Sequence, residues 1–120
     1  MAEDNLEIME TQKDGRVFKN LNLKTRVKAG AVIQGIQPGN HIVVKKTTFP
    51  EGRKLPNFPL YSCTCEYKGE QVSIVLNEQE HEHWKQFDID DNIKISLEQE
   101  PYEFQGKKGM KAVLTFEKVE

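Results

Sequence analysis

The feature that most constrains the fold is a pair of strand-like segments on either side of Lys68-Gly69. A two-residue loop that ends in glycine is typical of the primed turns that match the twist of antiparallel strands. With this loop, one face of the hairpin pairs Cys65 with Val72, Cys63 with Ile74 and Tyr61 with Leu76. The other face pairs mostly polar residues, namely Glu66 with Gln71, Thr64 with Ser73 and Ser62 with Val75. A one-residue shift would mix the two faces, so the sequence predicts a hairpin with one buried face and one solvent face.

A short helix is predicted directly after this hairpin. Asn77 can cap the helix, and Glu80 stands at the position where its side chain completes a capping box. Trp84 and Phe87 are three residues apart and therefore share one helix face. We expect about three helical turns, ended by the polar residues Asp88, Asp90, Asp91 and Asn92.

Two strands and a long connection are predicted after the helix. Apolar and polar residues alternate at 93–97 and again at 110–119, which indicates half-buried strands. The intervening residues 98–109 contain one proline and two glycines, and we interpret them as a long hairpin tip.

The N-terminal part gives weaker signals. Residues 1–10 are acidic and contain no basic residue, so we expect a loosely held terminus, followed by a weak hairpin around Asp14-Gly15. Strands are predicted at 31–36 and 41–49, either as two strands or as one strand bent at Pro38-Gly39, and a loop follows. A basic run precedes them, which we interpret as a solvated face in preference to a phosphate-contacting edge. Its members are Arg16, Lys19, Lys24, Arg26 and Lys28.

The overall composition excludes little. The formal net charge is −2, which gives no global signal for nucleic acid, so local charge matters more than the total. No apolar run approaches membrane-spanning length and no secretory pattern opens the chain, so the expected location is the cytoplasm. Cys63 and Cys65 lie two apart on one strand face, which disfavours a mutual disulfide and predicts reduced, buried thiols.

The sequence gives no support for catalysis or metal binding. His81 and His83 would point away from each other on a helix, and Cys63-Thr-Cys65 lacks the looped spacing of structural zinc sites. No Ser-His-Asp arrangement, P-loop or GxGxxG pattern occurs. We therefore expect a protein that is not an enzyme and holds neither a metal nor another cofactor.

From residue 41 onward, the predicted order is strand, long loop, strand, tight turn, strand, helix, strand, long hairpin and strand. In this order the chain resembles the OB-fold of single-stranded DNA-binding proteins and replication protein A domains. The resemblance implies an all-β, five-stranded Greek-key barrel at 31–120, with one short helix between strands three and four. Residues 1–30 would form an N-terminal extension.

The resemblance also implies non-catalytic binding of single-stranded DNA, with RNA left open, in replication, recombination or repair. The solvent face of strands two and three would carry the nucleic acid, and loops at 49–59 and 100–109 would clamp it. Both loops contain aromatic residues for stacking and cations for phosphates, although Phe49 and Phe58 could equally pin their loop to the barrel. Of Lys45 and Lys46, only one can face the groove. The predicted nucleic-acid-binding residues are Lys45, Lys46, Phe49, Arg53, Lys54, Phe58, Thr64, Ser73, Tyr102, Phe104, Lys107, Lys108 and Lys111.

A second function class remains open. The predicted helix side is strongly acidic and could recruit a basic protein partner within a nucleic-acid-processing or viral assembly. Its acidic residues are Glu78, Glu80, Glu82, Asp88, Asp90 and Asp91. The sequence predicts no membrane partner and leaves the oligomeric state open.

Overall fold

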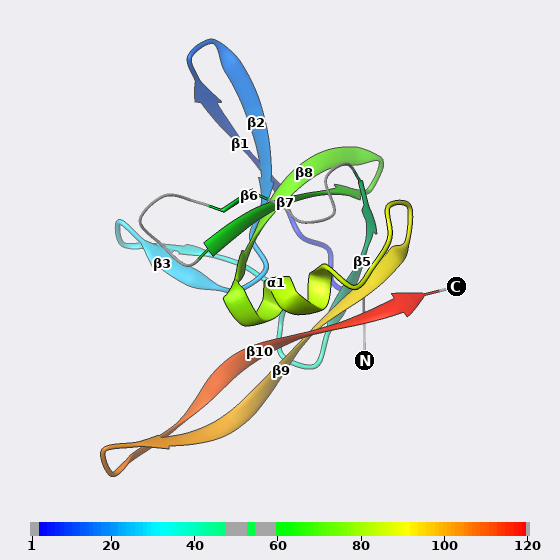
Figure 1. Ribbon diagram of the computed structural model, residues 1–120. Helices are drawn as coiled ribbons and strands as arrows, with labels where there is room; N and C mark the ends of the chain where they lie inside the picture. Colours follow the sequence, from blue (N-terminus) through cyan, green and yellow to red (C-terminus); the bar gives the residue numbers. More distant parts are fainter. Residues whose placement is uncertain (1–2, 48–52, 55–59, 120) are drawn as a thin grey trace.

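The computed structural model describes residues 3–47, 53–54 and 60–119. Over these residues the fold is all-β with one short helix, which confirms the predicted class (Figure 1). The elements are, in order, β1 (Ile8–Lys13), β2 (Arg16–Leu21), β3 (Arg26–Lys28), β4 (Ala31–Ile33), β5 (His41–Lys46), β6 (Arg53–Lys54), β7 (Leu60–Tyr67), β8 (Glu70–Asn77), α1 (Glu78–Trp84), β9 (Asn92–Phe104) and β10 (Lys107–Val119).

Most strands belong to one large sheet with the order β1-β2-β8-β7-β5-β9-β10, in which β6 also pairs with β7, while β3 and β4 form a small sheet. The prediction of five strands in a barrel is therefore wrong in strand number, and within the described residues β8 and β10 do not pair to close the sheet. The N-terminal residues explain the difference. β2 runs parallel to β8 with Asn20 opposite Ser73, at the edge of β8 that a closing strand would need.

The central hairpin of β7 and β8 has the predicted register along its whole length. Cys63, Cys65, Val72 and Ile74 on its inner face are all buried. The backbone angle φ is positive at both turn residues, 53° and 79°, as a type I′ turn requires. The same pattern of two positive φ angles closes the other hairpins, at Asp14-Gly15, Ala29-Gly30 and Gln105-Gly106.

The predicted capping box begins α1. The amide N of Glu80 donates to Oδ1 of Asn77 at 2.8 Å, and the amide N of Asn77 donates to Oε1 of Glu80 at 2.9 Å. The helix ends at Trp84, so it is shorter than predicted, and Phe87 lies beyond it in a half-buried position. The Trp84 side chain is fully buried within the main core. The helix face predicted for Trp84 and Phe87 is apolar, which favours such a buried position.

The N-terminal segment is tied to the core, so the prediction of a loosely held terminus is wrong for the residues after Met1-Ala2. Leu6 is buried, and its amide N donates to the Tyr67 hydroxyl at 3.0 Å. The same hydroxyl donates to the carbonyl O of Asp4 at 3.3 Å. Leu21 and Leu23 also belong to this core, and the predicted boundary after residue 30 falls in the turn between β3 and β4.

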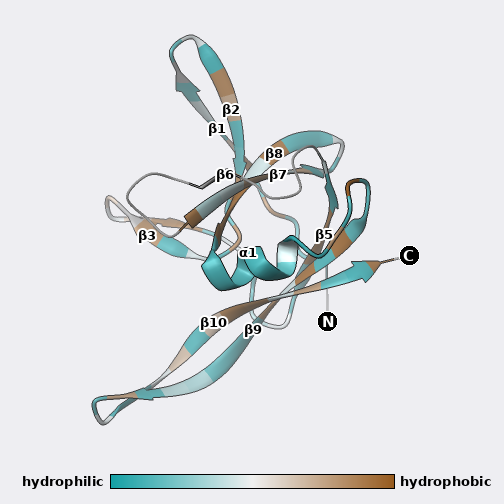
Figure 2. Cartoon of the chain, viewed as in Figure 1, coloured by the Kyte–Doolittle hydropathy of each residue, from teal (hydrophilic) through white to brown (hydrophobic). Residues whose placement is uncertain are grey.

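Two hairpins project from the body, one made of β1 and β2 and the other of β9 and β10 (Figure 1). β9 and β10 are 13 residues each and meet at a two-residue turn, so paired strands extend through most of the long hairpin tip predicted at 98–109. Both projections are largely hydrophilic, with short hydrophobic stretches (Figure 2).

β4 and β5 are separate strands, so the region 31–49 forms two strands and not one bent strand. Among the described residues, no helix combines the length and the apolar character needed to cross a membrane.

Candidate nucleic-acid interface

The projecting β9–β10 hairpin gathers four of the predicted site residues on one face. Residues directly opposite each other in an antiparallel pair share a face, and the register places Phe104 opposite Lys107 and Tyr102 opposite Gly109. Lys111 lies on the same face, two positions beyond Gly109. We call Tyr102, Phe104, Lys107 and Lys111 the arm face. Its aromatic side chains are 46% and 66% exposed and lie next to each other on one face, so they form an apolar patch and not a single exposed residue.

The Tyr102 ring is held in place by the glycine across from it. A Cβ atom at position 109 would lie only 2.9 Å from Cε1 and 3.0 Å from Cζ of Tyr102. The ring therefore lies against the bare backbone of Gly109, an arrangement that covers a strand glycine with an aromatic side chain. Because the ring is already ordered, a ligand that stacks on it has a smaller loss of side-chain entropy to offset.

Lys108 is separated from the other predicted arm residues. Because side chains alternate along a strand, it points to the opposite face, where it lies across from Glu103. Lys107 and Lys108, both predicted to bind nucleic acid, therefore lie on opposite faces of the hairpin. On the arm face itself, Glu100 lies opposite Lys111 and Glu98 follows toward the body. The outer part of the hairpin, beyond these two carboxylates, is thus the stretch of this face that best suits an anionic ligand.

Thr64 and Ser73 lie where the sequence predicts them, opposite each other on the outer face of β7 and β8. Both are half-buried. This face carries small polar groups and no described aromatic ring in its β7–β8 pairs from Ser62–Val75 to Glu66–Gln71. It can lie beneath a strand of nucleic acid, but any stacking has to come from elsewhere.

A groove of about 690 Å³ lies beside this face. We call it the N-terminal groove. Its floor includes the outward β8 residues Ser73, Val75 and Asn77, and its walls come from β1, from β2 and from residues 22–26. Sequence reasoning missed it, because it forms only when the N-terminal hairpin docks on β8. The one available signal was the basic run, since Lys24 and Arg26 both line the groove.

A smaller pocket of about 180 Å³ continues from the groove toward β10. We call it the junction pocket. Lys24, Asn77, Glu80 and Leu114 line both hollows, and Lys111 of the arm face lines the junction pocket. The groove and the base of the β9–β10 hairpin are therefore linked by two adjoining hollows, with the Lys24–Glu80 pair between them.

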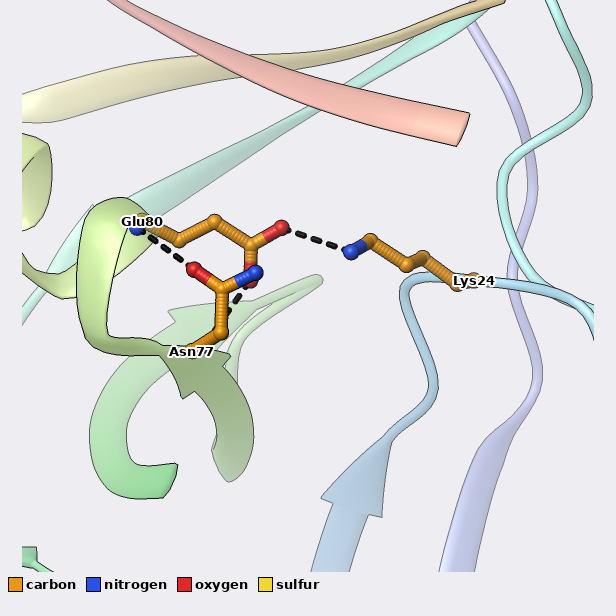
Figure 3. Close-up of polar contacts among 3 residues, drawn as sticks. All are labelled: Lys24, Asn77 and Glu80. Atoms are coloured by element: carbon orange, nitrogen blue, oxygen red, sulfur yellow. Dashed lines mark hydrogen bonds and ion pairs between the residues drawn. The ribbon is translucent and has the colours of Figure 1, made fainter. Parts of the chain in front are cut away.

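The charge at this junction is balanced by an ion pair. Nζ of Lys24 lies 2.8 Å from Oε2 of Glu80, while the other carboxylate oxygen of Glu80 accepts the capping bond from Asn77 (Figure 3). The Glu80 side chain is only 10% exposed. Its negative charge is thus engaged from two sides and presents little repulsion to an anionic ligand.

Lys45 and Lys46 point to opposite faces of β5, as alternation along a strand requires. Lys46 lies in the core and not at the surface. It is fully buried, and its Nζ donates to the carbonyl oxygens of Trp84 and Phe87. We therefore remove Lys46 from the candidate interface. Lys45 is the outward residue, yet it lies opposite Glu66 and its Nζ is 3.8 Å from Oδ1 of Asp90, so its charge is partly offset.

The remaining predicted residues belong to the first long loop. Phe49 and Phe58 lie outside the described residues. Arg53 and Lys54 form β6, whose backbone pairs with Ser62 and Tyr61 of β7. This pairing places the β6 backbone along the free edge of the outer β7 segment, next to the predicted binding face.

Comparisons of the chain with models of protein families, with curated proteins and with solved structures found no match.

Proposed function

We propose that this protein binds single-stranded nucleic acid, with DNA preferred over RNA, and performs no catalysis. The observation that carries the proposal is the arm face, where two exposed aromatic rings share one side of a projecting hairpin with two lysines. Single strands are held by bases stacking on aromatic rings and by cations that neutralise phosphates. A duplex hides its base faces, so this combination favours unpaired strands.

The order of the strands supports the same proposal. β5, β7, β8, α1, β9 and β10 follow one another as the strands and helix of an OB-type barrel do, with β8-β7-β5-β9-β10 as their order in the sheet. We assign the fold to an opened barrel of this type, in which β2 lies along β8. In such barrels the face of strands two and three and the last hairpin bind oligonucleotides, which here are the β7–β8 face and the β9–β10 hairpin.

The alternative is a protein-docking module that uses the acidic side of α1. Its acidic residues have cationic partners at several points, which weakens this surface as an anionic patch. The ion pairs join Glu80 to Lys24, Glu82 to Lys85, Asp90 to Lys45 and Asp91 to Lys118. A basic partner would have to compete with these lysines, so we favour nucleic acid.

Fluorescence anisotropy with labelled oligo-dT, and with a duplex of equal length, tests the proposal at low salt. The wild-type protein should bind the single strand more tightly. Phe104→Ala should weaken binding roughly 5- to 150-fold, the equivalent of about 1–3 kcal/mol per lost stack. Met110→Ala is the matched control, because Met110 is an exposed apolar residue on the opposite face of the same hairpin. Equal affinity for duplex and single strand, or equal losses in the two variants, would contradict the proposal.

A further inference from the structure

We infer that the N-terminal hairpin of β1 and β2 is a second arm for the same nucleic-acid strand, and that the strand passes through the N-terminal groove between the two arms. This inference rests on the proposed function and extends it to residues that an OB-type barrel does not include. It assigns stacking to Phe18 and phosphate contacts to Arg16 and Arg26.

The two faces of the N-terminal hairpin differ in chemistry. The register pairs Met9 with Asn20 and Thr11 with Phe18, and Met9, Thr11 and Asn20 line the groove. Phe18 therefore continues this groove-side face toward the tip, and 46% of its surface is exposed. It repeats the arrangement of Tyr102 and Phe104, an exposed ring on one side of a projecting hairpin.

The opposite face of this hairpin is already occupied. Lys19 lies opposite Glu10 there, and its Nζ is 2.5 Å from Oε1 of Glu70 on β8. This contact raises the pKa of Lys19, because the Glu70 carboxylate accepts a hydrogen bond from the ammonium and favours its charged form. The Lys19–Glu70 pair joins this face of the hairpin to β8, while the face that carries Phe18 is the one that continues the groove.

The groove suits a polyanion. Among the described residues that line the groove or the junction pocket, Glu80 is the only acidic one, and Lys24 pairs with it. Arg26 lines the groove, and Arg16 is exposed at the tip of the groove-side face, directly across from position 13. The local balance is therefore positive, although the chain as a whole has a net charge of −2.

The wall that carries Lys24 and Arg26 is held rigidly. Nδ2 of Asn22 donates to the carbonyl O of Lys24 at 2.6 Å, and the Thr25 hydroxyl accepts from the amide N of Gly35 at 3.0 Å. A Cβ atom at position 35 would lie 2.4 Å from the carbonyl C of Lys24, so only glycine allows the two segments to pack this closely. A wall fixed before binding lowers the cost of ordering it around a ligand.

The path between the arms is continuous. It runs from the arm face through Lys111 into the junction pocket, along Asn77 and Ser73 in the groove, and out along the hairpin to Phe18. The molecule measures 46 Å along its longest axis. A strand that follows the whole path must be longer than one that occupies the β9–β10 hairpin alone.

This difference in length provides the test. Binding is measured with oligo-dT of about 5 and about 15 nucleotides, which lie near the lower and upper ends of the usual site sizes of an OB-type domain. Wild-type protein should bind the longer oligonucleotide more tightly. Phe18→Ala should weaken binding of the longer one roughly 5- to 150-fold and leave the shorter one nearly unchanged. Arg26→Ala should flatten the salt dependence for the longer one alone.

Val17 provides the matched control, because it is 54% exposed and points to the opposite face of the same hairpin. Val17→Ala should bind both lengths as the wild type does. If Phe18→Ala also binds both lengths as the wild type does, the second arm is wrong and the proposed function stands. If the wild type binds neither length, the proposed function and the second arm both fail.

Discussion

The Lys46 ammonium on β5 donates a hydrogen bond to the end of α1 at Trp84, whose side chain fills the core. Its Nζ donates to the carbonyl O of Trp84 at 2.6 Å and lies 5.3 Å from the centroid of the same indole ring. A second bond, also 2.6 Å, goes to the carbonyl O of Phe87. Burial lowers the pKa of Lys46 below its ordinary value of 10.5, opposed by the nearby groups Cys63, Asp88 and Asp91. The side chain therefore acts as a C-terminal cap for the helix.

Replacing Lys46 should show this role. Lys46→Met keeps the length of the side chain but removes the buried ammonium that donates to the carbonyl oxygens of Trp84 and Phe87, of which the first keeps its bond from the Phe87 amide N. We therefore expect the free energy of unfolding to fall by about 1–3 kcal/mol. Urea unfolding followed by Trp84 fluorescence measures it. Lys45→Met, one position away and exposed to solvent, should change stability by less than about 0.5 kcal/mol. Equal losses in the two variants would show that the cap contributes nothing.

The indole of Trp84 should report the packing of the helix against the sheet. Because it is fully buried, its emission should be blue-shifted in the native protein and move to longer wavelength on unfolding. Trp84→Ala should cost about 3–5 kcal/mol, the range for removing a large aromatic side chain from a core. Native emission at the wavelength of free indole would contradict the placement of α1.

The two cysteines should make the protein less stable in alkali. Burial raises the pKa of Cys63 to about 11 and that of Cys65 to about 12, from an ordinary 9.0. Between pH 9 and 11 the unfolded chain releases thiol protons that the folded chain retains. The free energy of unfolding should therefore fall as pH rises, by up to about 1.4 kcal/mol per pH unit for each thiol.

The test compares wild-type protein with the Cys63→Ala/Cys65→Ala double variant by urea unfolding across this pH range. The variant should be less stable at neutral pH, because core atoms are lost, but its stability should decline less steeply. Native thiols should also react slowly with a thiol reagent near neutral pH, since the thiolate is the reactive form. Parallel pH curves for the two proteins would refute the assignment.

Local features of the fold could be predicted from the sequence, because their causes lie within a few residues. The register around Lys68-Gly69 follows from the sorting of apolar and polar side chains, and the capping box follows from the spacing of Asn77 and Glu80. The docking of β2 on β8 depends instead on a single parallel pairing between residues far apart in the sequence, Asn20 and Ser73. No local pattern encodes such a contact, so the hairpin around Asp14-Gly15 could be predicted, but its docking on β8 and the groove that it forms were missed.

The residues of the candidate site also differ in whether a local sequence pattern could predict their placement. Alternation predicted that Tyr102 and Phe104 share a face, which the register confirms. The same rule would have separated Lys107 from Lys108, but the prediction grouped them as two cations of one loop and did not assign each to a strand face. Lys46 was misassigned because its partners are backbone carbonyls, which no side-chain pattern can reveal.

The salt dependence of oligo-dT binding by Lys107→Ala and Lys108→Ala tests the central claim most directly, since these neighbours carry the same charge and differ in the face they occupy. Each phosphate contact on a single strand contributes a slope of about −0.7 to a plot of log affinity against log salt concentration. Lys107→Ala should weaken binding and flatten the slope by about one such contact, and Lys108→Ala should leave both unchanged. Identical slopes for the two variants, or wild-type binding no tighter than millimolar at low salt, would contradict a nucleic-acid interface on the arm face.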